Sequence, residues 1–123
     1  MAVTYSFEDA LVKFDCVGVY PSAEVLVKFL AALEDPSCPP RFALLFDVSR
    51  SESLRSRPVD EIRTVAEFLG PHAERVARCA VVAGADAQFG LGQLGAVYSE
   101  DVGVETRVFR TEDAAREWLD GRG

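Results

Sequence analysis

Two apolar runs constrain the fold of this sequence more than any other feature. Residues 42–46 (FALLF) and 76–83 (VARCAVVA) are apolar almost throughout, and each is followed by a polar stretch and then by a helix-like pattern. A strand that is apolar on both sides has to be covered on both faces, as in a parallel sheet wrapped by helices. The two runs therefore predict an α/β fold.

The remaining pattern adds a hairpin, a further strand and four helices. Apolar and polar residues alternate over 3–7 and 12–17, which predicts two antiparallel strands joined at Glu8 and Asp9. Another strand is predicted over 104–109. The predicted helices run from Pro21 and Ser22 to the prolines that begin at Pro36, from Pro58 to Gly70, from a capping Asp86 to about Glu100, and onward from a capping Thr111.

The predicted element order is therefore ββαβαβαβα. Repeated strand, helix, strand units form right-handed crossovers, so the order predicts a mixed, mostly parallel sheet covered by helices. The length of 123 residues predicts a single domain over residues 1–123.

Charge and length exclude several classes of function. The formal net charge of -7 opposes the phosphates of nucleic acids and the anionic surfaces of membranes. No apolar run approaches the roughly 20 residues that cross a bilayer, and the first residues do not resemble a signal peptide. The three cysteines are widely spaced, which predicts reduced thiols. We therefore expect a cytoplasmic protein with no nucleic-acid partner and no membrane partner.

The segment GLGQLG at residues 90–95 matches the G-x-G-x-x-G pattern of dinucleotide-binding loops. Strands precede and follow it, which keeps nucleotide binding open. In such loops, however, the first glycine turns directly off the strand, whereas here residues 84–89 intervene and Asp86 brings negative charge to the helix start. We expect instead that the glycines allow close packing of the helix, with Gly95 best placed for it.

No group of residues meets the requirements of a catalytic or metal site. His72, the only histidine, follows a helix end, and no catalytic or ligating partner can be assigned to it. The acidic pairs fall at turns and helix ends, where solvated carboxylates are ordinary. The sequence therefore predicts no catalytic residue, no metal ligand and no cofactor, and hence a protein that is not an enzyme.

Residues 47–58 (DVSRSESLRSRP) form the one basic cluster of an acidic chain. They follow a buried parallel strand, so we expect a loop at the carboxyl edge of the sheet, where ligands and partners bind in such folds. Its arginines suit a phosphate on a neighbouring serine or an anionic ligand, and a solvated, mobile loop is the alternative. The candidate residues are Asp47, Ser49, Arg50, Ser53, Arg55, Ser56 and Arg57.

The C-terminal half carries a resemblance to a known family. It contains a buried strand, a Q-F-G-L segment at 88–91 that opens a helix, an R-V-F strand at 107–109 and an A-x-x-W-L helix at 115–119. This pattern resembles the SpoIIAA-like proteins of the STAS superfamily, named for a bacterial anti-sigma factor antagonist, and the resemblance covers nearly the whole chain. It implies a SpoIIAA-like fold and a regulatory role through protein binding.

The resemblance also implies a regulatory serine. In SpoIIAA proteins a D-L-S segment leaves the central strand, and a D-S-S-G segment carries the serine that a partner kinase phosphorylates. Asp47-Val48-Ser49 is similar to the first segment, and Ser56 falls about where that serine would be. The neighbours of Ser56 are Arg55, Arg57 and Pro58, which departs from the family pattern.

Two hypotheses follow. The first is a regulatory domain that binds a protein partner, such as a kinase or an anti-sigma-like factor, through the 47–58 loop and the start of the third helix, alone or as a homo-oligomer. The second, since related domains resemble Sec14-type lipid-binding proteins, is a carrier of a small apolar or anionic, lipid-like molecule between the third helix and the sheet. The candidate pocket residues are Gly84, Asp86, Gln88 and Phe89.

Overall fold

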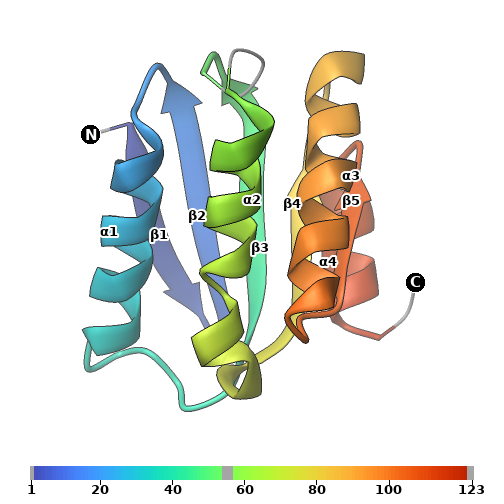
Figure 1. Ribbon diagram of the computed structural model, residues 1–123. Coiled ribbons are helices and arrows are strands. Elements are labelled where there is room, and N and C mark those ends of the chain that lie inside the picture. The colour runs from blue at the N-terminus through green and yellow to red at the C-terminus, as the bar shows by residue number, and fades with distance from the viewer. Residues whose placement is uncertain (1, 54–56, 122–123) are drawn as a thin grey trace.

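The computed structural model describes residues 2–53 and 57–121, and the strands in these ranges form one five-stranded sheet (Figure 1). β1 pairs antiparallel with β2, and the other neighbouring strands are parallel. This confirms the predicted α/β fold with a mixed, mostly parallel sheet. In spatial order, which is also chain order, the strands are β1 (Val3–Glu8), β2 (Leu11–Gly18), β3 (Phe42–Ser51), β4 (Val76–Val82) and β5 (Thr106–Phe109).

Three helices cover one face of the sheet, and one helix covers the other. α1 (Ser22–Glu34), α2 (Val59–Glu67) and α3 (Asp86–Asp101) lie in front of the sheet in Figure 1, and α4 (Glu112–Leu119) lies behind it. Because each parallel strand is added on the same side of the one before, right-handed crossovers place the three connecting helices on one face. The predicted order is confirmed, with a short 3-10 helix, η2 (Gly70–Arg75), added after α2.

The helix starts agree only in part with the predicted caps. Thr111 caps α4 as predicted, since its Oγ1 accepts a hydrogen bond from the Ala114 N–H at 3.3 Å. The predicted Asp86 cap is wrong: Ala85 is the capping residue of α3, and Asp86 is the first residue inside the helix. The side chain of Gln88 reaches back and accepts from the Ala85 N–H at 3.4 Å, and so serves the helix start in place of Asp86.

The three glycines of GLGQLG lie inside α3 and not in a turn off β4. A Cβ atom at Gly92 would lie 3.3 Å from Val108 Cγ1, and one at Gly95 would lie 3.6 Å from Ile62 Cγ2. These two glycines therefore allow close packing, Gly92 against the sheet and Gly95 against α2. For Gly90 the packing expectation is wrong, because a Cβ there would meet nothing within 4 Å.

β3 is longer than predicted and takes up part of the expected 47–58 loop. The strand runs to Ser51, so Asp47, Ser49 and Arg50 are strand residues and the loop prediction is wrong for them. The cause is pairing with β2: after an irregularity that follows Asp15, the end of β2 continues beside residues 50 and 51 of β3. Sheet pairing thus overrides the polar, loop-like composition of this stretch.

The sheet divides the core into two clusters of unequal size. The larger cluster lies against α1, α2 and α3, and the smaller one lies against α4. The larger cluster contains Val3, Val12, Phe14, Cys16, Tyr20, Val25, Phe29, Ala32, Phe42, Leu44, Leu69, Val76, Cys79 and Val104. The smaller cluster contains Leu45, Ala80, Val82, Ala115 and Trp118.

Candidate functional site

The two segments predicted to share one face do meet at the carboxyl edge of the sheet. The Gln88 side chain, at the start of α3, donates from Nε2 to the carbonyl oxygen of Ser51 at 2.9 Å. Beside it, a Cβ atom at Gly84 would lie 3.8 Å from Cβ of Ser49. Gln88 is buried, and both ends of its amide are used to join α3 to β3 and to the helix start, so its role here is structural.

Arg110 organises the start of α3. Its guanidinium lies 2.8 Å from the Asp86 carboxylate and 4.2 Å from the ring centroid of Phe89, and it donates to the carbonyl oxygen of Gly84 at 3.1 Å. The negative charge that argued against a phosphate at this helix start is therefore balanced by an arginine from the end of β5. This arrangement holds three of the predicted pocket residues, Gly84, Asp86 and Phe89, at the rim of the domain.

Asp47, Ser49 and Arg50 lie on β3 at the same edge. Oδ1 of Asp47 accepts from the Ser49 N–H at 3.0 Å and from the Ser49 hydroxyl at 2.6 Å. The Arg50 side chain is 63% exposed and lies 3.3 Å from Asp15 of β2. Arg50 is therefore available at the surface, whereas the Asp47 and Ser49 side chains bind each other.

Tyr20, which the sequence analysis did not predict as a site residue, joins the segment between β2 and α1 to the end of β3. Its N–H donates to Ser53 Oγ at 2.8 Å, and its hydroxyl lies 2.7 Å from Ser51 Oγ. Tyr20 is buried, and burial raises the pKa of its phenol to about 12, so the phenol is protonated at neutral pH. Ser53, a predicted candidate, is accordingly part of this buried bonding and not of an open loop.

Arg57 also differs from the exposed loop residue that was expected. Its guanidinium donates to the carbonyl oxygen of Tyr20 at 2.7 Å and to Ser22 Oγ at 2.8 Å, and it lies 4.9 Å from the centroid of the Tyr20 ring. Only 11% of its side chain is exposed. Arg57 therefore joins the start of α2 to the start of α1. Arg55 and Ser56 lie outside the described residues.

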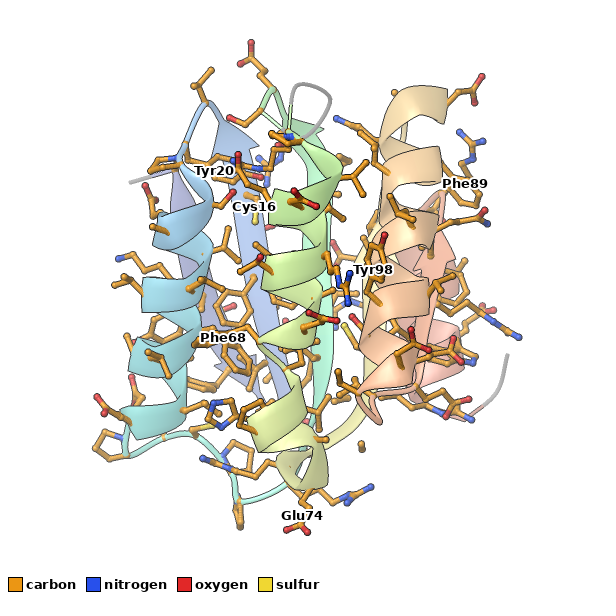
Figure 2. The ribbon with its side chains drawn as sticks, in the orientation of Figure 1. Cys16, Tyr20, Phe68, Glu74, Phe89 and Tyr98 are labelled. Carbon is orange, nitrogen blue, oxygen red and sulfur yellow. The ribbon has the colours of Figure 1, made fainter. Side chains whose placement is uncertain are left out.

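A cavity of about 140 Å³ lies between the sheet and α1, α2 and α3. In Figure 2, Cys16 and Tyr20 lie near the starts of α1 and α2, and Phe68 lies lower between these helices. All three side chains contribute to its lining. The rest of the lining includes Val25 and Phe29 of α1, Ile62 and Ala66 of α2, Leu91, Gly92, Gly95 and Ala96 of α3, and Phe46, Cys79 and Val81 of the sheet.

The chemistry of the cavity is almost entirely neutral and apolar. Among the described residues that line it, Arg57 is the one charged side chain. Burial raises the pKa of the Cys16 and Cys79 thiols to about 12 each, so both are protonated at neutral pH and are poor nucleophiles. The cavity therefore suits an apolar molecule better than a metal ion or a reactive substrate.

The cavity is not where the sequence placed a pocket along α3. Within the described ranges its lining on α3 begins at Leu91 and does not include the predicted Gly84, Asp86, Gln88 or Phe89. One sequence signal does point to the cavity: small residues recur at helical spacing along α3. These residues, which leave space between the helix and its neighbours, are Gly92, Gly95, Ala96 and Ser99.

Neither a metal site nor a membrane span emerges from the described residues. The ring centroid of His72 lies 5.6 Å from that of Phe29 and 6.0 Å from that of Phe68, so this histidine packs against the apolar core. Over residues 2–53 and 57–121, no three His, Cys, Asp or Glu side chains gather into a metal-binding group. None of the described helices combines the length and the apolar character needed to cross a membrane.

No protein-family model and no curated protein matches the sequence. Among solved structures, the chain is similar to an uncharacterized protein from the DUF3478 family with a SpoIIAA-like fold, from Shewanella loihica PV-4. The TM-score is 0.61, with 15% sequence identity over 96% of this chain and 92% of that chain. A likeness at this identity concerns the fold. It confirms the resemblance drawn from the C-terminal half: the chain has a SpoIIAA-like fold.

Proposed function

We propose that this protein is a non-enzymatic binding domain that holds a small, mainly apolar molecule between its sheet and α1, α2 and α3. The observation that carries the proposal is the cavity of about 140 Å³ in that position. An apolar cavity of about 150 Å³ engineered in another protein binds benzene, so a cavity of this size accepts a molecule of about one ring. The second sequence hypothesis, a small-molecule carrier, is thus the one that the geometry favours.

The lining of the cavity supports a ligand. The described side chains that line it are mainly apolar. A molecule that fills the cavity removes apolar surface from water, which stabilises the complex by about 25 cal/mol per Å² of apolar area buried.

Native mass spectrometry of protein purified from its source cells tests the proposal. Ala66 is buried on α2 and lines the cavity, so Ala66→Leu places three more carbon atoms in it. Ala23 is exposed on α1, so Ala23→Leu adds the same atoms outside the cavity. We expect an extra mass on the wild type and on Ala23→Leu, and none on Ala66→Leu. Bare wild-type protein, or an extra mass retained by Ala66→Leu, would contradict the proposal.

A second function, regulatory binding of a protein partner at the carboxyl edge, is favoured by a separate observation. Val17, Val19 and Val59 are 40%, 78% and 52% exposed. Val17 pairs with the exposed Arg50, and Val19 and Val59 lie in the segments that Arg57 joins. Exposed apolar side chains around a surface arginine are typical of the centre of a protein interface. Phosphorylation of Ser56 remains a prediction.

Affinity capture with edge variants tests this second function. Val19→Asp combined with Arg50→Glu removes the apolar and the basic part of the edge, and Val97→Asp alters an exposed valine of α3 as the control. We expect a partner that is retained by the wild type and by the control and is lost from the double variant. The same set of bound proteins for all three baits would contradict a partner site at this edge.

A further inference from the structure

We infer that the cavity takes a small apolar monocarboxylate, of single-ring or branched aliphatic size, whose carboxylate pairs with Arg57. This inference rests on the proposed function, because it assumes that the cavity is a ligand site. It adds the charge of the ligand and the residue that recognises it.

The first argument is the isolation of one positive charge. The chain carries 20 acidic and 13 basic residues, yet among the described residues that line the cavity Arg57 is the one charged side chain. A cationic or strongly polar ligand would find no counter-charge in this lining. A single anionic group would find one.

The second argument is the incomplete compensation of that charge. Arg57 donates hydrogen bonds to two neutral acceptors, the carbonyl oxygen of Tyr20 and the hydroxyl oxygen of Ser22, and the Ser22 hydroxyl in turn donates to Glu61. The ion pair of Arg57 with Glu61 is long, at 3.6 Å, and 46% of the Glu61 side chain is exposed, against 11% for Arg57. A guanidinium held so far from water is stabilised by an anion brought close to it, and its planar fork matches a carboxylate.

The third argument is the separation between the charged end and the apolar body of the cavity. The Arg57 guanidinium lies 4.9 Å from the centroid of the Tyr20 ring, and both residues line the cavity. Tyr20 lies near the starts of α1 and α2, whereas Phe68 lies lower between these helices (Figure 2). The side chains of Phe29, Phe46 and Phe68 also line the cavity and offer apolar surface to a ring or a branched chain. A molecule with one anionic end and one compact apolar end matches this arrangement.

Size restricts the class further. A volume of 140 Å³ accepts about one ring, by comparison with the benzene-binding cavity of about 150 Å³. A long acyl chain does not fit such a space. The inferred ligand is therefore a small organic acid and not the lipid-like cargo that the sequence left open.

Calorimetric titration of ligand-free protein at pH 7.5 tests the inference with two probes that share one ring. Benzoate carries the carboxylate, and benzyl alcohol is its neutral counterpart. We expect the wild type to bind benzoate at least tenfold more tightly than benzyl alcohol. Arg57→Met keeps the apolar stem and removes the charge, so benzoate binding should fall at least tenfold while benzyl alcohol binding stays within about twofold.

Two further variants keep the test decisive. Arg50→Met removes an exposed arginine at the same edge, and it should change neither affinity. Arg57→Lys keeps the charge but loses the planar fork, so it should weaken benzoate binding about three- to tenfold. If Arg57→Met does not fold, as judged by circular dichroism, then Arg57→Lys and the comparison of the two probes on the wild type decide the question.

The outcomes separate this inference from the proposed function. Equal affinity of the wild type for both probes, or benzoate binding that does not change in the Arg57 variants, would overturn the anion inference while leaving the apolar cavity as a ligand site. Failure of both probes to bind the wild type would overturn the proposed function as well.

Discussion

The two faces of the sheet are closed in different ways. Three helices cover the front face and leave an apolar cavity of about 140 Å³ beneath them. The single helix α4 covers the back face with a buried cluster around Trp118, and a hollow of about 350 Å³ at its end is bordered by Glu8, Asp9 and Arg116. Charged residues contribute one member, Arg57, to the described lining of the cavity. On the back face they form a network instead: Arg116 lies 2.9 Å from Glu8 and 2.7 Å from Glu112.

The difference follows from the side chains that the helices bring to the sheet. α4 places the largest side chain, Trp118, on the strands, with the guanidinium of Arg78 at 4.6 Å from its ring. α3 places glycine and alanine there, as at Gly92 and Ala96. The hollow at the end of α4 is bordered by charged side chains, whereas the cavity under α1, α2 and α3 is lined mainly by apolar ones, which is consistent with apolar binding at the front.

The largest expected effect is the loss of the back-face anchor. Trp118→Ala removes a buried aromatic side chain and should lower the free energy of unfolding by about 3–5 kcal/mol. Urea unfolding followed by circular dichroism measures it. Val97→Ala, at a position 58% exposed, should change stability by less than about 0.5 kcal/mol. A Trp118→Ala loss below about 1 kcal/mol would show that α4 does not hold this face.

Alkaline pH should lower the free energy of unfolding through the two buried thiols of the front face. The folded-state pKa values of Cys16 and Cys79 are raised to about 12 from 9.0, so their stabilising effect is complete below pH 9 and is lost as the pH rises towards 12. Because one pKa unit corresponds to 1.36 kcal/mol, each thiol should cost about 2 kcal/mol of stability at pH 10.5. Urea midpoints at pH 8 and pH 10.5 measure this loss.

The variant Cys16→Ala with Cys79→Ala supplies the control for the alkaline loss. It should be less stable than the wild type at pH 8, but its stability should fall much less on going to pH 10.5. Tyr20, whose pKa is raised to about 12 by burial, accounts for part of the remaining fall. Equal falls for the wild type and the double variant would contradict the assignment to the thiols.

The same substitution on each face should have opposite results. Ala115 of α4 is fully buried in the back-face cluster. Ala115→Leu overpacks this cluster and should lower the free energy of unfolding by up to about 3 kcal/mol. Ala66→Leu extends into the cavity and should cost less than about 0.5 kcal/mol or raise stability. Thermal unfolding of ligand-free protein compares the two. A larger loss for Ala66→Leu would mean that the front face has no spare volume.

Acid pH should lower the free energy of unfolding through the ion pairs of the back face, and this is the smallest of the expected effects. Hydrogen bonds from Arg116 lower the pKa values of Glu8 and Glu112, so their contribution is present above the unfolded value of about 4.5 and is lost as the pH falls through the folded values. Both carboxylates lie near the surface, so the contribution of the pair is below about 1 kcal/mol. Glu112→Gln should flatten the stability profile between pH 5 and pH 3, and an unchanged profile would exclude Glu112 as its source.

Much of the fold was predictable because apolar patterning determines element type and order. The runs at 42–46 and 76–83 are buried strands of the parallel part of the sheet, and Thr111 caps α4 as its side chain suggests. The extension of β3 to Ser51 was not predictable, since it depends on pairing with the end of β2. The prediction that Asp86 caps α3 was wrong, because the Gln88 side chain accepts the hydrogen bond at the helix start instead.

The site was less predictable than the fold. The sequence brought the 47–58 segment and the start of α3 to one edge, and Gln88 and Ser51 do meet there. Arg57 was predicted to be a surface loop residue, because its hydrogen-bond partners lie 35 and 37 positions away in the sequence and no local pattern indicates them. The cavity depends on how three helices are seated against a sheet, and local patterns do not contain that information.

The most direct test of the contrast between the two faces is a methyl NMR titration with benzyl alcohol, in protein labelled at Ile, Leu and Val methyl groups. Ile62, Val65 and Leu91 line the cavity, while Leu45 and Val82 belong to the back-face cluster. We predict saturable shifts of the Ile62, Val65 and Leu91 methyl signals and unchanged Leu45 and Val82 signals. Shifts of equal size on both faces, or none on either, would contradict a ligand site beneath α1, α2 and α3.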